Sequence, residues 1–194
     1  MTQIAAIVLA AGWSARFGAN KLLAPIEGKP IVRHAAEAAL ASRASPVVVV
    51  TGNTASAVTA ALSGLVVEIV ENQAFANGLS TSLKCGLRNV PADCDAAVIL
   101  LGDMPFVRPA LIDALIEAFD PANRRAICVP VRNRRRGNPV LWGRAFFPEL
   151  LSLDGDAGAK RLMTRHEDVL YELEAGDDGP FIDIDTPEDL KAHE

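Results

Sequence analysis

The feature that most constrains the fold is an apolar run, Ile4–Leu9, that leads directly into a loop rich in glycine and cations. An apolar run without alternation is typical of a strand buried on both faces of a parallel sheet. The loop that follows contains Gly12, Arg16, Gly18 and Lys21. Open α/β sheets bind ligands at the carboxyl ends of their strands, and backbone N–H groups with nearby cations favour a phosphate there.

This loop matches neither of the two common phosphate-binding signatures. It has no G-K-[S/T] tripeptide, and the pattern G-x-G-x-x-G is absent. The alternative interpretation is an ordinary turn between a strand and a helix, with its cations facing water. The position of the loop directly after a buried strand favours phosphate binding.

Composition indicates one globular α/β domain over residues 1–194. The chain is 50% hydrophobic but only 5% aromatic, so its core consists mainly of Ala, Val, Leu and Ile. The apolar runs are too short to cross a membrane, and no basic segment precedes the first of them. A net charge of −5 argues against nucleic acid as a partner. Three widely spaced cysteines predict reduced thiols in a cytoplasmic protein.

Strand and helix patterns alternate along the chain. Buried strands are predicted over residues 4–9, 47–51, 65–70, 96–101 and 126–131, and helices over 31–42, 53–62 and 109–119. Short connections between them favour a doubly wound sheet. The expected fold is a three-layer α/β/α sandwich with a mostly parallel, Rossmann-like sheet.

Two further segments contain candidate ligand-binding residues. Gly78 precedes Ser80 and Thr81, whose hydroxyls either face a ligand or cap a helix; these residues alone favour capping. Asp103, in Gly-Asp-Met-Pro, follows the most apolar strand. A carboxylate there suits Mg²⁺, which takes one or two carboxylates plus substrate phosphates. The alternative is an aspartate that only stabilises a turn.

Charged residues dominate the last third of the chain. The arginines of the segment 132–136 either hold a second anion or form a solvated basic face. Asp156 is a candidate helix cap, and Lys160 faces either the site or water. In the segment 181–185, apolar and acidic residues alternate, which predicts that Asp183 and Asp185 share one strand face.

Taken together, several motifs resemble those of the molybdenum cofactor nucleotidyltransferases, and more narrowly the cytidylyltransferase branch. They are L-A-A-G-x-S-x-R-x-G-x-N-K-L-L, G-D-M-P, G-N-P-V-L-W, G-D-x-G-A-K and D-I-D-T-P-E-D-L. The matches extend from Leu9 to Leu190. The first motif together with G-D-M-P is specific for the wider superfamily, whose members have a GT-A-like fold.

The resemblance implies a role for each matching position. It places the nucleotide against Leu9, Ala10, Ala11, Gly12, Ser14, Arg16, Gly18, Lys21, Gly78 and Ser80. It implies that Arg16, Lys21 and Asp103 are catalytic, and that Asp103 and Asp185 hold Mg²⁺, with Asp183 as the alternative to Asp185. The acceptor side then includes Asn138, Pro139, Asp156 and Lys160. Relatives with L-A-G-G tend to transfer guanylyl, so Ala11 favours CTP over GTP.

The implied reaction is transfer of CMP from CTP to molybdopterin, with release of pyrophosphate and subsequent delivery to a molybdoenzyme or its chaperone. Two alternatives remain open. One is a nucleotidyltransferase that uses GTP or another phosphorylated acceptor, such as a sugar or alcohol phosphate. The other is a non-catalytic protein that binds and delivers the cofactor, although delivery alone does not require a metal carboxylate.

Overall fold

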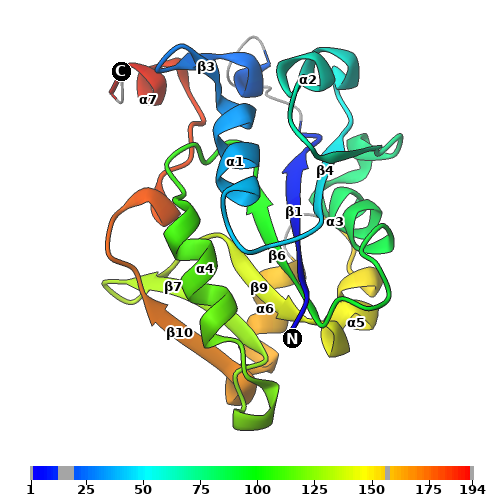
Figure 1. Cartoon of the computed structure of the whole chain (residues 1–194), viewed down its shortest axis with the longest axis vertical. Coiled ribbons are helices and arrows are strands. Elements are labelled where there is room, and N and C mark those ends of the chain that lie inside the picture. The colour runs from blue at the N-terminus through cyan, green and yellow to red at the C-terminus, as the bar shows by residue number, and fades with distance from the viewer. Residues whose placement is uncertain (1, 13–19, 156–157, 193–194) are drawn as a thin grey trace.

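A mixed sheet forms the centre of the molecule, with strand order β10-β7-β9-β6-β1-β4-β5 and β8 paired to β7 (Figure 1). The computed structural model describes residues 2–12, 20–155 and 158–192. The strands are β1 (Ile4–Ala10), β4 (Val47–Thr51), β5 (Glu68–Glu71), β6 (Ala96–Leu101), β7 (Ile127–Arg132), β8 (Arg135–Arg136), β9 (Val140–Gly143) and β10 (Leu170–Glu174). A separate small hairpin joins β2 (Pro25–Ile26) to β3 (Lys29–Pro30).

Helices cover both faces of this sheet. They are α1 (Ile31–Leu40), α2 (Ala55–Ala61), α3 (Leu79–Arg88), α4 (Pro109–Ala118), α5 (Phe147–Ser152), α6 (Gly158–Arg165) and α7 (Pro187–Ala192). Residues of α1, α2 and α4 share one core cluster, and residues of α3, α5 and α6 share the other. Figure 1 shows α1 and α4 in front of the sheet. The predicted three-layer arrangement is therefore confirmed.

Most strand pairs of the central sheet are parallel, as predicted. β1 runs parallel to β6 and β4, β4 to β5, and β7 to β10, whereas β9 is antiparallel to both of its neighbours. All seven residues of β1 are buried, with even-numbered side chains in one core cluster and odd-numbered ones in the other. A strand covered on both faces has no polar face, which explains its unbroken apolar sequence.

The close contact between α3 and the sheet depends on Gly86. A Cβ at this position would lie 2.5 Å from Cγ2 of Ile7, whose side chain is fully buried. We expect Gly86→Ala to lower the free energy of unfolding by about 1–2 kcal/mol, because overpacking outweighs the gain in helix propensity. Urea denaturation followed by circular dichroism measures this change, and an unchanged midpoint would contradict the assigned contact.

Two details of these elements differ from the sequence predictions. The third predicted strand, 65–70, is displaced to Glu68–Glu71. Helix α3 begins at Leu79 after Gly78, so the prediction of capping by Ser80 or Thr81 is wrong. Gly78 adopts φ 101° at this start, a conformation that favours glycine.

The acidic segment near the C-terminus is also not a strand. Residues Gly179–Phe181 form a 3₁₀ turn, and residues 182–186 continue without strand pairing. The alternation there reflects burial instead, because Ile184 is fully buried while Asp183 is exposed. The prediction that Asp183 and Asp185 share a strand face is therefore wrong.

Candidate functional site

The carboxyl ends of β1 and β6 bring two of the predicted motifs together. Leu9 and Leu101 are partners in the parallel register, and Gly102 N–H donates a 2.9 Å hydrogen bond to the Leu9 carbonyl. This hydrogen bond fixes the backbone just before Asp103, so that Asp103 lies beside the start of the glycine-rich loop. This is the sheet edge at which the sequence predicts a ligand.

A lysine and two aspartates from three distant parts of the chain converge at this edge. Lys21 Nζ lies 2.7 Å from Asp103 Oδ2 and 2.6 Å from Asp185 Oδ1. The C-terminal segment reaches this position because Ile184 N–H donates to the Asp103 carbonyl at 3.1 Å. The backbone of Lys21 is fixed by the adjacent 3₁₀ turn (Lys21–Leu23), where Leu22 is 4% exposed.

The two carboxylates keep the Lys21 ammonium charged. Burial by itself would lower the pKa of Lys21, but the charge of Asp103 and the hydrogen bonds to Asp103 and Asp185 outweigh it, and the pKa is raised. Its side chain is 15% exposed, against 21% for Asp103 and 42% for Asp185. The cluster is therefore partly shielded from water, where charge interactions are stronger than at the surface.

Residues 178–185, here called the C-terminal strap, cross the molecule from β7–β9 to Asp103. Asn138 N–H donates a 2.9 Å hydrogen bond to the Pro180 carbonyl, just beyond β8. A Cβ on Gly137 would lie 2.4 Å from this same oxygen, and one on Gly179 would lie 2.3 Å from the Phe106 carbonyl. The strap reaches its place because glycine stands at both close approaches.

Because Asp185 ends the strap, a disturbance at Gly137 should reach the charged cluster. We expect Gly137→Ala to lower kcat about tenfold to a hundredfold with little change in the fold, since a misplaced catalytic group costs rate steeply. Gly176→Ala is the matched control, because a Cβ there meets nothing within 4 Å. Steady-state kinetics of both variants test this, and equal rates would show that the strap does not position Asp185.

A cavity of about 870 Å³ opens next to this cluster. Leu101 and Met104, which flank the Gly102–Asp103 turn, line it together with Asp183. Its walls also contain apolar side chains, Leu79, Leu83, Ile99, Val140, Trp142, Leu153, Met163 and Phe181, and polar ones, Ser80, Asn138, Thr164, Glu167 and Glu172. Concave, mostly apolar sites with a few polar groups are typical of small-molecule binding.

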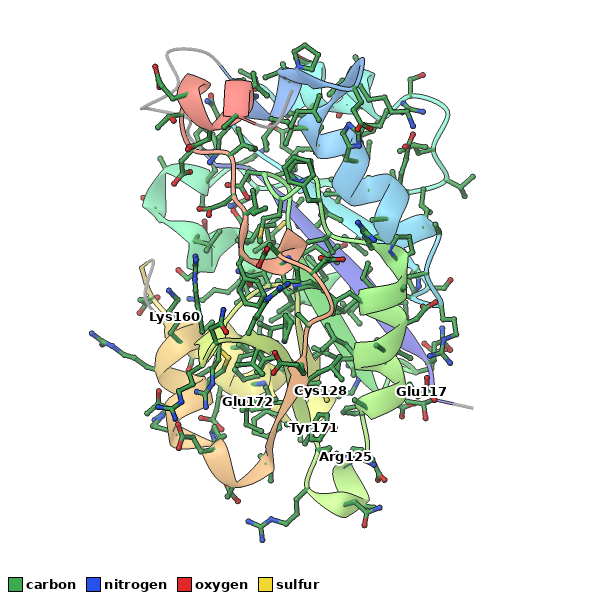
Figure 2. All side chains as sticks on the ribbon, turned by 90° about the vertical axis from the view of Figure 1, so that its left-hand side faces the viewer. Glu117, Arg125, Cys128, Lys160, Tyr171 and Glu172 are labelled. Carbon is green, nitrogen blue, oxygen red and sulfur yellow. The ribbon has the colours of Figure 1, made fainter. Side chains whose placement is uncertain are left out.

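Cations line one part of the cavity. Arg134, Arg135, Arg136 and Lys160 all contribute to its wall. Arg136 is neutralised by Glu172 at 2.6 Å and Glu167 at 3.4 Å. Among the residues that the structure describes, Arg134 and Lys160 have no carboxylate within ion-pair distance. Figure 2 labels Lys160 on α6 and Glu172 on β10, two of the elements that contribute to this wall.

The arginine-rich segment is a hairpin rather than an open loop. Asn133 and Arg134 both have positive φ values, 50° and 62°, between β7 and β8, as a tight two-residue turn of type I′ requires. Arg132 pairs with Asp178 of the strap at 3.3 Å, and Arg135 lies 5.9 Å above the ring of Phe181. Part of the basic cluster therefore holds the strap, and Arg134 extends to the cavity.

Apart from Lys21, the predicted nucleotide-binding residues fall into four groups. Leu9 and Ser80 are buried and line the cavity. Ala10 and Ala11 are 1% and 2% exposed, and Gly12 is exposed. Ser14, Arg16 and Gly18 lie outside the described residues. Gly78 precedes α3, which begins beside the cavity at Leu79.

The predicted acceptor residues lie farther along the same surface. Asn138 and Lys160 line the cavity. Pro139, which follows Asn138 in the chain, is buried. Asp156 lies outside the described residues. The structure thus brings Asn138 and Lys160 into one cavity with Leu9 and Ser80.

No cluster of three or more His, Cys, Asp or Glu side chains suited to a metal occurs among the described residues. Any ion held by Asp103 and Asp185 would therefore need further ligands, and phosphate oxygens are the usual ones for Mg²⁺.

The three cysteines are free thiols, and burial raises the pKa of Cys128 to about 12. No helix in the described part of the chain is long and apolar enough to cross a membrane.

Sequence reasoning missed most of the cavity wall. Leu83 and Met163 have the apolar character of ordinary core residues, and nothing in their spacing distinguishes them, whereas Trp142 ends the matching motif G-N-P-V-L-W. Arg134 stands out in the sequence only as a member of a basic cluster. Asn133, a residue common in two-residue hairpin turns, is the one sequence feature that could have predicted the turn that carries Arg134.

Comparison with known sequences identifies the family. The profile of the MobA-like NTP transferase domain matches residues 6–169. The purine catabolism protein PucB of Bacillus subtilis is 30% identical over 196 residues, covering 94% of this chain and 92% of that protein. The bifunctional protein GlmU of Pelobacter propionicus is 34% identical over 151 residues, but this chain spans only 32% of its length. A probable molybdenum cofactor guanylyltransferase of Thermococcus sibiricus is 31% identical over 125 residues, covering 64% of this chain and 60% of that protein.

Solved structures agree with this grouping. Rv0371c from Mycobacterium tuberculosis H37Rv superposes with a TM-score of 0.87 and 31% identity, over 98% of this chain and 97% of that chain. A manganese complex of Rv0371c superposes with a TM-score of 0.81 at 31% identity, over 99% and 98% of the two chains. Since the family profile matches residues 6–169, most of the chain, it belongs to the MobA-like NTP transferase family of nucleotidyltransferases.

Proposed function

We propose that this protein transfers CMP from CTP to the terminal phosphate of molybdopterin or its molybdenum-loaded form and releases pyrophosphate. The observation that carries the proposal is the convergence of Lys21, Asp103 and Asp185 at the sheet edge, directly beside the 870 Å³ cavity. The charged cluster suits a metal–triphosphate group, and the cavity suits a large acceptor.

The pair of carboxylates fits a divalent ion. Asp103 Oδ2 and Asp185 Oδ1 already converge on one cation, the Lys21 ammonium, and carboxylate oxygen is the ligand type that Mg²⁺ prefers. Asp185 is favoured over Asp183 as the second carboxylate because Asp183 lines the cavity instead. When bound, the ion would neutralise charge on the phosphates. Lys21 and Arg16 would add to this, with Lys21 as a mobile point charge.

The character of the cavity supports an acceptor with a flat ring system and an anionic end. Its walls carry Leu83, Trp142 and Met163, and Arg134 and Lys160 supply cations without carboxylate partners in the described residues. A phosphate acceptor is already an anion, so attack on the α-phosphorus needs no strong general base. The protein then contributes mainly positioning and charge neutralisation.

The choice of CTP depends on Ala11. A Cβ on Gly52 would lie 2.8 Å from the Ala11 Cβ, so the Ala11 methyl group, which is 2% exposed, packs against the turn after β4. A glycine at position 11 would leave more room at this edge, which agrees with the larger base in the guanylyl branch. The product would then pass, in the cytoplasm, to a molybdoenzyme or its chaperone.

Pyrophosphate release with Mg²⁺ tests the proposal. CTP, GTP, ATP and UTP are offered in turn, with and without molybdenum-loaded molybdopterin. Release with CTP only when the pterin is present is the expected result. Release with GTP instead would refute the choice of base. No release with any nucleotide and the pterin, but release with a sugar or alcohol phosphate, would refute the choice of acceptor.

A further inference from the structure

Lys21 occupies the position between two carboxylates that the proposed function assigns to a metal. Its Nζ contacts Asp103 Oδ2 at 2.7 Å and Asp185 Oδ1 at 2.6 Å. The same lysine is expected to hold the triphosphate during the reaction. One ammonium cannot satisfy both sets of oxygens unless its position changes between the metal-free and the substrate-bound protein.

The backbones of all three residues are anchored. Ala24 N–H donates to the Lys21 carbonyl at 3.1 Å, and Ile184 N–H donates to the Asp103 carbonyl at 3.1 Å. Asp185 N–H donates to Asp189 Oδ2, also at 3.1 Å. The part that can move with little cost is the four-carbon side chain of Lys21, because a lysine stem has many rotamers of similar energy.

We propose that Lys21 and the divalent metal use the same pair of carboxylates in turn. With a divalent ion bound, Asp103 and Asp185 would hold the ion in place of the Lys21 ammonium, which would then be available to the phosphates. This inference rests on the assignment of the metal to Asp103 and Asp185 in the proposed function. Lys21 thus competes with the metal for the two carboxylates before it binds the phosphates of the nucleotide.

Exchange is favoured over shared occupancy for an electrostatic reason. An ammonium that stayed at hydrogen-bond distance from both oxygens would lie about 3 Å from an ion bound to the same atoms. Like charges at that separation repel strongly in a partly shielded site. Side-chain exposures of 15% for Lys21 and 21% for Asp103 indicate such shielding.

The exchange also explains how the metal-free site remains assembled. Two carboxylates that face each other without a cation repel, and the Lys21 charge relieves this repulsion. Without the lysine, the same repulsion would be relieved by a metal ion alone. The metal affinity of the site should therefore increase when Lys21 is removed, while its turnover should decrease.

The test is a Mn²⁺ titration without nucleotide or acceptor, followed by electron paramagnetic resonance of the free ion. Lys21→Met should bind Mn²⁺ about tenfold more tightly than the unmodified protein or better. Lys84→Met is the matched control. Lys84 lies on α3, where its Nζ pairs with Asp154 at 3.0 Å, and its loss changes the net charge of the protein by the same amount as the loss of Lys21. This control should leave the Mn²⁺ affinity unchanged. Asp103→Asn should weaken binding.

The outcomes separate the exchange from the metal assignment. If Asp103→Asn weakens Mn²⁺ binding but Lys21→Met does not strengthen it, the exchange is overturned and the metal site stands. If neither substitution changes the affinity, the metal assignment fails together with the exchange. Thermal unfolding gives a second measurement: Lys21→Met should melt at a lower temperature in chelator and gain more from Mn²⁺ than the unmodified protein. An equal gain in both would also overturn the exchange.

Discussion

Replacing Asp103 with asparagine should reduce kcat for nucleotidyl transfer about 10³-fold, equivalent to ~4 kcal/mol of lost transition-state stabilisation. The side chain sits at the tip of β6 on a fixed backbone and contacts Lys21 Nζ at 2.7 Å. An amide of nearly the same shape has no charge to hold either a metal or the ammonium. Pyrophosphate release at saturating Mg²⁺ measures the loss.

The fold of this variant should persist, because Asp103 is partly exposed and does not belong to either core cluster. Circular dichroism and the unfolding midpoint check this. Asp168→Asn is the control, since Asp168 pairs with Arg124 at an exposed position. A variant at position 103 with normal turnover would remove Asp103 from the catalytic machinery.

Lys21→Met should reduce kcat/KM for the nucleotide about 10²- to 10³-fold, because a cation that neutralises the phosphates is lost from a shielded site. This substitution should therefore tighten Mn²⁺ binding and slow catalysis at the same time. A purely structural role for Lys21 would predict that both properties weaken together.

The matched control is again Lys84→Met, which removes a cation of similar exposure, 18% against 15% for Lys21. Its kcat/KM should stay within about twofold of the unmodified value, because its partner Asp154 is 94% exposed and neither residue belongs to the charged cluster. If Lys21→Met turned over at the same rate as this control, the nucleotide would not depend on the Lys21 charge.

Much of the sheet follows from the sequence because its central strands are buried on both faces. β1, β4 and β6 are almost entirely apolar, and short apolar runs bounded by turn residues are typical of buried parallel strands. By contrast, β9 is four residues long, and β10 is a half-exposed edge strand with alternating Glu residues. Their pairing depends on tertiary contacts that no local pattern encodes.

The start of α3 shows how local rules fail near the candidate site. Ser80 and Thr81 are good capping residues, yet the helix begins earlier because Gly78 supplies the φ of 101° that the turn needs. Thr81 Oγ1 instead donates to the Ala74 and Gly78 carbonyls, at 3.0 and 2.9 Å. A hydroxyl that donates to carbonyls of the preceding turn does not accept from the free N–H groups of the helix, so α3 begins without a side-chain cap.

The residues of the charged cluster could be predicted from the sequence, but their contacts with one another could not. Motif resemblance identifies Lys21, Asp103 and Asp185, and it assigns the lysine to phosphate and the aspartates to metal. Lys21 and Asp185 are 164 positions apart, so no spacing rule predicts their 2.6 Å contact. The contact follows from the strap, which depends on glycine at positions 137 and 179.

The most direct test of the proposed transfer follows isotope from the two ends of the triphosphate. CTP labelled at the α-phosphorus is incubated with the protein, Mg²⁺ and molybdenum-loaded molybdopterin, in parallel with CTP labelled at the γ-phosphorus. We expect the α label to appear in the pterin product and the γ label in pyrophosphate. Transfer of the γ label to the acceptor, or retention of both labels in CTP, would contradict nucleotidyl transfer to the pterin.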